Sequence, residues 1–244
     1  MYRMEPRLLH SIQHRGEDAQ ATLAVIKGRD QLVGTRTKLS NHVRGTLKSL
    51  GITLKGCSPL SMPDNAPDQI PTKFWPSVST VLDTIRHLNE QIKELDKSIE
   101  HICKVDYPET EHLRQVPGIG PITALTFVLT LEDPARFEGS RSVGAFLGLT
   151  PKRDQSGDTD KQLHITKAGN GLLRRLLVTA AQYILGPFAQ ESALRDYGER
   201  ISARGGKRSK RCAVVALARK LAVLLHRLWM DKSVYKPYPN GAPA

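Results

Sequence analysis

Residues 149–175 place a serine that could attack a phosphate among cations that could hold one. The stretch reads LTPKRDQSGDTDKQLHITKAGNGLLRR. Serine is a weak nucleophile at its own pKa, so Ser156 would need a general base or a strong positive field. Gly157 gives the backbone the freedom to present the hydroxyl. The cations that could supply the field by binding the phosphate are Lys152, Arg153, Lys167, Arg174 and Arg175, with Lys161 also close in sequence.

The same stretch also fits a solvated loop that leads into a helix. A Ser-Gly pair in a polar surface loop is more often a simple turn, so the residues alone leave the nucleophile the weaker hypothesis. Asp154, Asp158 and Asp160 could form a magnesium cluster, but in a basic loop we interpret them as turn and capping residues. We interpret His164 as structural and Asn170 as the N-cap of the next helix.

The charge of the chain favours a polyanionic partner. Its 244 residues carry a formal net charge of +12, and no Asp or Glu occurs in residues 161–190 or 201–230. In the second of these windows the sequence predicts a flexible basic loop ahead of a helix. We expect that loop to contact phosphate, with a solvated loop as the alternative. Its cations are Lys207, Arg208, Lys210 and Arg211.

Residues 113–129, LRQVPGIGPITALTFVL, have the pattern of a helix-hairpin-helix. Gly118 and Gly120 would let the backbone turn tightly with its amides exposed. Together with the N-terminus of the helix that begins at Pro121, these amides could bind a phosphate oxygen without reading base sequence. The alternative is an ordinary tight turn between two helices. The motif predicts DNA contact and implies no catalysis.

A heptad pattern predicts a coiled coil over residues 78–102. Eight apolar residues recur there at alternating steps of three and four, and charged residues fill the other faces. The partner could be the helix predicted at residues 16–50, as an antiparallel hairpin, or the same helix of a second subunit. Prolines and glycines predict a linker or long turn over residues 51–76. The apolar residues of the pattern are Val78, Val81, Ile85, Leu88, Ile92, Leu95, Ile99 and Ile102.

Beyond the coiled coil, the pattern predicts a compact helical domain, so the fold class is mainly α. We expect helices at 109–116, 121–131, 169–185, 189–203 and 212–231, a short segment at 142–147, and one weak strand candidate at 162–165. Cys57, Cys103 and Cys212 form no CxxC pair, which predicts neither a disulfide framework nor a zinc site and fits a reducing cytosol. We find no sequence pattern of a signal peptide or a membrane span.

Taken in order, these features resemble the DEDD-type insertion-sequence transposases related to the Piv and MooV DNA invertases. The most specific blocks are PGIGPITA, RSVGAFLGLTP with the Ser-Gly pair after it, and ITKAGNGLLRR, and the similarity covers about residues 3–232. The family combines a RuvC-like domain, a coiled coil and a transposase domain, and it is associated with guide RNA that bridges target and donor DNA. The resemblance implies that Ser156 forms a covalent link to DNA, while Lys167 and Arg174 contact phosphate.

The resemblance suggests a division of the chain. Residues 1–15 would be the remnant of an upstream domain, and residues 16–106 the coiled-coil hairpin with its proline-rich linker. Residues 107–232 would be the transposase C-terminal domain, with the helix-hairpin-helix at 109–131, and residues 233–244 a tail.

The sequence departs from the family in its acidic residues. The family's RuvC-like domain supplies four carboxylates that bind magnesium, and Glu5, Glu17 and Asp18 match none of its motifs. We therefore expect a truncated transposase with no cofactor in this chain, Mg²⁺ entering only with the missing acidic domain. The expected partners are DNA, a guide RNA, and further copies or a full-length relative through residues 78–102, in the bacterial cytoplasm at the nucleoid. The alternative is a non-catalytic nucleic-acid-binding remnant or competitor.

Overall fold

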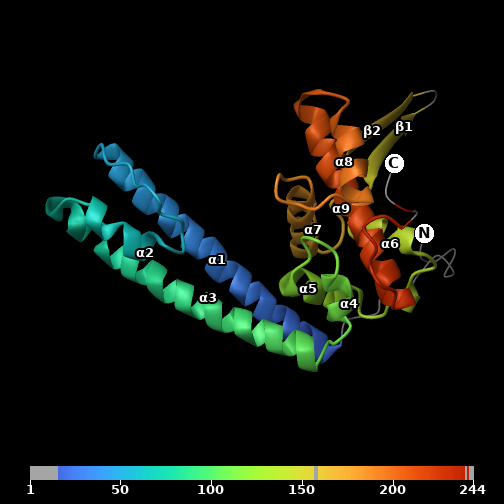
Figure 1. The fold of residues 1–244 in the computed structure, drawn as a ribbon, viewed down its shortest axis with the longest axis horizontal. Coiled ribbons are helices and arrows are strands. Elements are labelled where there is room, and N and C mark those ends of the chain that lie inside the picture. The colour runs from blue at the N-terminus through green and yellow to red at the C-terminus, as the bar shows by residue number, and fades with distance from the viewer. Residues whose placement is uncertain (1–15, 157–158, 240, 242–244) are drawn as a thin grey trace, which may run out of the picture.

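The computed structural model of the chain describes residues 16–156, 159–239 and 241, with only the backbone described at 159–162. These residues are mainly helical, which confirms the predicted fold class. The helices are α1 (Glu17–Ser49), α2 (Met62–Asn65), α3 (Ser79–Val105), α4 (Thr110–Arg114), α5 (Pro121–Leu131), α6 (Ser140–Phe146), α7 (Gly171–Ile184), α8 (Ala193–Ser202) and α9 (Gly206–Asp231). Two strands, β1 (Pro151–Ser156) and β2 (Thr159–Ile165), form an antiparallel hairpin. Figure 1 shows a long arm made by α1 and α3 beside a compact body made by α4–α9.

In the arm, α1 and α3 run antiparallel. Arg29 of α1 pairs with Asp96 of α3 at 2.7 Å. Seven residues later in α1, Arg36 donates to Asn89 at 3.0 Å, which lies seven residues earlier in α3. Every second residue of the heptad pattern is buried, beginning with Val78 and ending with Ile99, while the intervening four are half-buried. Of the two partners that the sequence left open, the structure contains the helix of the same chain.

The proline-rich segment 51–76 is more ordered than a linker. It holds α2 and two 3-10 turns at Pro67–Gln69 and Thr72–Ser77. Pro63 lies in the first turn of α2, where a missing N–H costs no helical hydrogen bond. Met62 is fully buried, and the segment forms a small core with the ends of α1 and α3. Gly51, with a φ of +79°, follows the end of the long helix, and the chain then folds back to cover the far end of the arm.

The body is organised around α5, which is buried on every side. All residues from Thr123 to Leu131 are buried, because α7 and α9 pack on α5 from within the body and the arm packs on it from outside. The main core includes Phe127, Leu173, Leu177, Leu217, Leu221 and Leu225. Leu125 and Leu129 instead meet Leu23 and Ile26 of α1. The same helix thus joins the two parts of the molecule.

The hairpin leaves the body through a close crossing of two backbone segments. Gly148 and Gly169 have φ values of +66° and +70°, which side-chain-bearing residues rarely adopt. A Cβ at Gly148 would collide with the backbone N and O of Ala168, and one at Gly169 would collide with the Phe146 carbonyl. The Lys167 N–H donates to the Gly148 carbonyl at 3.1 Å across this crossing. The two glycines permit the contact that fixes the base of the hairpin, which we call the hairpin root (residues 146–150 and 166–170).

The prediction of a polar loop around Ser156 was wrong for Asp154, Gln155, Thr159 and Asp160, since β1 and β2 are paired from Pro151↔Ile165 to Ser156↔Thr159. The strand candidate at 162–165 is confirmed and begins earlier, at Thr159. The sequence misled because PKRDQS has neither the alternation nor the β-branched residues typical of strands. The strands are held by the crossing at their root.

Replacing Gly148 with alanine should destabilise the chain by about 3 kcal/mol or more, from left-handed backbone strain and backbone collision together. Gly28→Ala is the matched control, because Gly28 lies within α1 with open space around its Cα. That variant should gain about 0.5–1 kcal/mol of helix stability. Urea unfolding followed by circular dichroism measures both. Equal stability of the Gly148→Ala variant and the parent would refute the tight crossing.

Candidate nucleic-acid interface

Most of the described side chains of the hairpin are exposed, while Ile165 at its base packs against the main core. All six residues of β1 are exposed, and so are Leu163 and His164 of β2. In Figure 1 the two strands project from the body beside α6 and α9. A two-stranded hairpin without a packed face is marginally stable in water by itself. Its exposed surface is therefore available to a partner, and a two-stranded ribbon has dimensions that the DNA major groove admits.

Ser156 is the last residue of β1, where it pairs with Thr159 beside the hairpin tip. Its side chain is exposed, and its hydroxyl makes no hydrogen bond to any residue that the structure describes. Strand alternation places Lys152 on the same face of β1, about 13 Å away at 3.3 Å per residue, and Arg153 on the other face. Both cations are exposed. Gly157 and Asp158 lie outside the described residues.

The acidic residues around Ser156 are placed differently from the prediction. Asp154 was interpreted as a turn or capping residue, but it lies within β1, opposite Lys161. His164 was interpreted as structural, but its side chain is exposed on β2. In the part of the chain that the structure describes, His, Cys, Asp and Glu form no group of three or more that could hold a metal ion.

The cations that follow the hairpin do different things in the structure. Lys167 is exposed at the root, with a φ of 57°. Arg174 is half-buried, and its Nη1 donates to the carbonyl oxygens of Leu147 at 3.0 Å and Ala168 at 2.7 Å. Arg175 pairs with Asp30 of α1 at 2.6 Å. The structure thus places Arg174 as a brace of the hairpin root and Arg175 as a link between body and arm.

Asn170 is the N-cap of α7, as predicted. Its Oδ1 accepts from the N–H groups of Leu172 at 3.0 Å and Leu173 at 3.1 Å, and its Nδ2 donates to Thr130 of α5. The cap therefore fixes the start of α7 against the core helix. Because α7 begins directly after the crossing, the same residue also fixes the direction in which the hairpin leaves the body.

The PGIG turn joins α4 to α5 and leaves two backbone amides available. Gly118 has a φ of +83°, and a Cβ there would lie 3.1 Å from the Tyr183 ring and 3.2 Å from the Ala180 carbonyl. Gly120 is the extended residue before α5. Both are exposed, and within the described residues neither N–H donates a hydrogen bond. Two free amides beside a helix N-terminus are suited to an anion.

Lys207, Arg208, Lys210 and Arg211 were predicted in a flexible loop, but they lie in the first turns of α9, which begins at Gly206. All four side chains are exposed. The first turn has no acidic residue, so these cations oppose the helix dipole at a cost of a few tenths of a kcal/mol each. An anion bound at this end of α9 would offset that cost.

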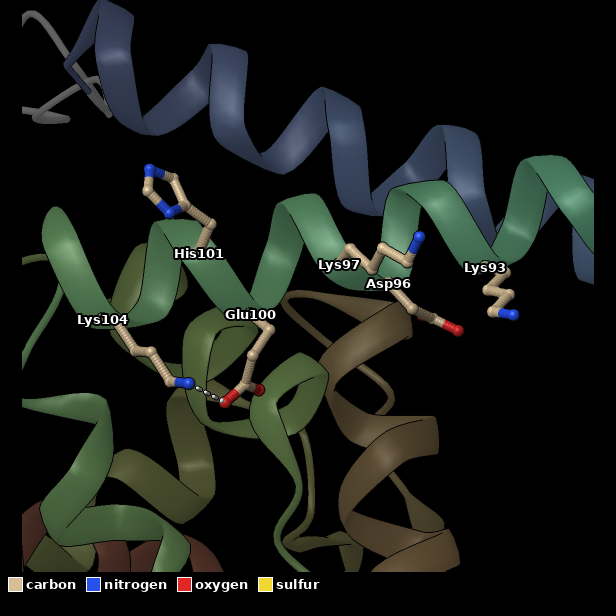
Figure 2. Close-up of a pocket in the computed structure, with 6 residues that line it drawn as sticks. All are labelled: Lys93, Asp96, Lys97, Glu100, His101 and Lys104. Atoms are coloured by element: carbon tan, nitrogen blue, oxygen red, sulfur yellow. Dashed lines mark ion pairs between the residues drawn. The ribbon is translucent and has the colours of Figure 1, made fainter.

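Figure 2 shows a pocket along α3, lined by Lys93, Asp96, Lys97, Glu100, His101 and Lys104, with Glu100 and Lys104 on the side that faces the body. Burial raises the pKa of Glu100, but a hydrogen bond and charge from Arg114 of α4, with Lys104, outweigh this and lower the pKa overall. Asp96 is paired with Arg29. Two of the acids that line the pocket therefore hold ion pairs within the fold. Sequence analysis did not find the pair of Asp96 because Arg29 lies 67 residues away.

The three cysteines are free, with Cys57 and Cys103 buried and Cys212 exposed, as expected for a chain without a disulfide framework. Among the described residues, we find no helix with the length and apolar character to cross a membrane.

Comparison with known proteins supports the interpretation of this surface. Residues 110–185 match the family described as Transposase IS116/IS110/IS902 family. The chain is 28% identical over 232 residues to the transposase for insertion sequence element IS1111A of Coxiella burnetii, covering 92% of this chain and 63% of that protein. It is 29% identical to the transposase for element IS1328 of Yersinia enterocolitica, covering 88% and 64%. A pilin gene-inverting protein of Moraxella bovis is 28% identical over 164 residues, covering 63% and 49%.

The chain is therefore related to the transposases of insertion sequences. The family it resembles over the body of the fold is the IS116/IS110/IS902 transposase family, and the matched residues run from α4 to the end of α7. It spans less than two thirds of the length of the first two relatives.

The placements of Arg174 and Arg175 predict different effects of substitution. Arg174→Gln removes two hydrogen bonds from a charged donor to backbone carbonyls at the root, so it should destabilise the chain by about 2–3 kcal/mol. Arg175→Gln removes a partly exposed ion pair and should cost at most about 1 kcal/mol. Urea unfolding compares the two variants. A larger loss for Arg175→Gln would contradict the brace assigned to Arg174.

Proposed function

We propose that this chain is the DNA-joining part of an insertion-sequence transposase, with Ser156 as the nucleophile. One observation carries the proposal: Ser156 lies exposed at the outer end of the hairpin, within the segment that matches the transposase family. In this proposal residues 107–232 form the transposase domain, the PGIG turn is a helix-hairpin-helix, and the arm is a coiled coil.

The proposed step is a phosphoryl transfer. The Ser156 Oγ attacks the phosphorus of a DNA phosphodiester, a new Oγ–P bond forms, and the bond from phosphorus to the leaving sugar oxygen breaks. The hydroxyl proton passes to a general base, and the leaving oxygen becomes a free DNA hydroxyl. The covalent link conserves the phosphodiester, so attack by a second DNA hydroxyl rejoins the strand and restores the serine.

The charges in this chain bind DNA around the reacting phosphate. Lys152 lies about 13 Å from Ser156, so it contacts a phosphate about four nucleotides from the attacked one at 3.4 Å each. Lys167 lies further back at the hairpin root. In the resembling family, carboxylates of an acidic domain hold Mg²⁺, which activates the reacting groups. That domain would supply the general base.

Contacts without sequence readout complete the proposed DNA grip. The amides of Gly118 and Gly120, with the N-terminus of α5, would bind one phosphate, and the cations at the start of α9 would bind others. These contacts position the duplex and carry no base information. A guide RNA would supply specificity by base pairing, as the resemblance implies, and the reaction would take place at the bacterial nucleoid.

The arm supports a second candidate function. Val81, Leu88, Leu95 and Ile102 remain half-buried although α1 already covers α3. This leaves an apolar edge through which a longer relative could pair with the chain. The chain would then act as a non-catalytic DNA-binding competitor in mixed oligomers.

Covalent trapping tests the nucleophile. The purified chain, incubated with labelled element-end DNA and Mg²⁺ together with the acidic domain of a full-length relative, should form a denaturant-stable adduct. Ser156→Ala should abolish that adduct, a loss of at least about 100-fold, because the attacking oxygen is gone. Denaturing gel electrophoresis measures it.

Ser142→Ala is the control, because the Ser142 hydroxyl is exposed in α6 and bonds only the Gly139 carbonyl. It should trap as well as the parent. Trapping that persists in Ser156→Ala would exclude Ser156 as the nucleophile. DNA binding with no adduct in any condition would favour the competitor.

A further inference from the structure

Arg219 of α9 packs against α6 at Gly144, where the absence of a side chain leaves room for it. Gly144 is buried in α6, and a Cβ there would lie 2.9 Å from Cγ and 3.2 Å from Nε of Arg219. The aliphatic part of Arg219 therefore lies against the backbone of α6. The residue is nevertheless exposed, and within the described part of the chain it has no ion pair or hydrogen bond. Gly144 thus makes room for Arg219, although Arg219 forms no hydrogen bond or ion pair within the described part of the chain.

Arg136, which precedes α6 in the sequence, packs against two aromatic rings, one of them on α6. Its guanidinium lies 5.2 Å from the centroid of Phe137 and 5.1 Å from that of Phe146, the last residue of α6. The two rings meet edge to face at 5.3 Å, so they form a fixed platform. Arg136 itself is exposed, and its one hydrogen bond is a long contact of 3.4 Å to the Leu131 carbonyl. The platform orients a cation toward solvent.

The support beneath these arginines is rigid. His226 of α9 is buried, its Nε2 lies 2.8 Å from the Pro134 carbonyl, and its Nδ1 lies 2.9 Å from the Ser140 hydroxyl. A carbonyl only accepts, so Nε2 carries the proton and Nδ1 accepts from Ser140. The His226 ring also packs edge to face on Phe137 at 5.5 Å. These contacts fasten the start of α6 to α9, seven residues beyond Arg219.

The charge around α6 is one-sided. Arg141 is exposed on α6 and, like Arg219, has no partner among the described residues. Glu138 is the single acid between residues 134 and 153, and no ion pair joins it to any of the three arginines. Three arginines without acidic partners, one before α6, one on α6 and one on α9 beside it, repel one another unless an anion is bound.

We infer that Arg136, Arg141 and Arg219, the α6 arginine cluster, bind the phosphate backbone of DNA at the hairpin root. This inference rests on the proposed function, since it extends the DNA path from Ser156 back to the body. The chain passes from Phe146 into β1 within five residues. The distance from Pro151 to Ser156 is about 17 Å at 3.3 Å per residue, so the cluster holds the duplex about five base pairs or more from the attacked phosphate.

The test is the salt dependence of DNA binding. The full chain binds a fluorescein-labelled duplex of 30 base pairs, and binding anisotropy is measured from 50 to 300 mM NaCl. The slope of log K against log[NaCl] is negative, and each lost phosphate contact reduces its magnitude by about 0.9. Arg219→Gln should lower it by about 0.9, and Arg136→Gln together with Arg219→Gln by about 1.8.

Arg227→Gln is the matched control, because Arg227 lies on the same helix, exposed, and pairs with Asp231 at 3.3 Å. Its slope should equal that of the parent. Gly144→Ala should lower the slope as Arg219→Gln does, since the new methyl group displaces the seated side chain, while circular dichroism confirms folding. Unchanged slopes for Arg219→Gln and for the double variant would overturn the inference.

The result is separable from the proposed chemistry. Ser156→Ala should leave the salt slope unchanged and abolish the covalent adduct, whereas the arginine variants should lower the slope. A normal slope change without any adduct would support the cluster and contradict the nucleophile. An adduct with no slope change in the arginine variants would support the nucleophile and contradict the α6 arginine cluster.

Discussion

The crossing of two backbone segments at Gly148 and Gly169 is the constraint on which the proposed site depends. Here the segment that leaves α6 and the segment that enters α7 touch backbone to backbone, with no room for a Cβ on either glycine. Arg174 donates to one carbonyl from each segment, and Asn170 caps α7 directly afterwards. Because these contacts hold the two strands together at their base, a hairpin whose described side chains are mostly exposed leaves the body in a defined direction.

The cations around that crossing fall into two groups, those that bond within the fold and those that face solvent. Arg174 donates hydrogen bonds to backbone carbonyl oxygens, and Arg175 forms an ion pair with Asp30. Lys152, Arg153, Arg141 and Arg219 face solvent and have no ion pair or hydrogen bond among the described residues. Cations that do no work inside the molecule cost stability through mutual repulsion, and a bound polyanion removes that cost. The pattern separates residues that build the hairpin root from the residues that we propose contact DNA.

Helices were predicted well because their signals are local. The sequence placed α5 at residues 121–131, where Pro121 at the first position and a continuous apolar run define it, and the structure agrees. It placed α1 and α3 within about three residues at each end, since the heptad pattern and the flanking prolines depend on neighbours alone. Asn170 was identified as a cap for the same reason.

What the sequence missed depends on contacts between distant residues. The polar strand β1 forms because the crossing brings it to β2, and nothing within PKRDQS indicates that. The start of α9 was placed too late, since glycine and a run of cations argue against a helix that tertiary packing nevertheless stabilises. The ion pair of Arg175 could not be predicted from the sequence, because Asp30 lies 145 residues away. The pairing of Arg219 with Gly144 likewise requires the fold.

The most direct test of the account is to identify the residue that carries DNA after trapping. Nuclease treatment of the adduct leaves a short nucleotide on the protein, and trypsin then releases residues 154–161, DQSGDTDK, as one peptide. Fragmentation mass spectrometry locates the added nucleotide mass. The account predicts that it lies on Ser156. The mass on Thr159, or on a peptide outside the hairpin, would show that the structure presents a different nucleophile and would contradict the central claim.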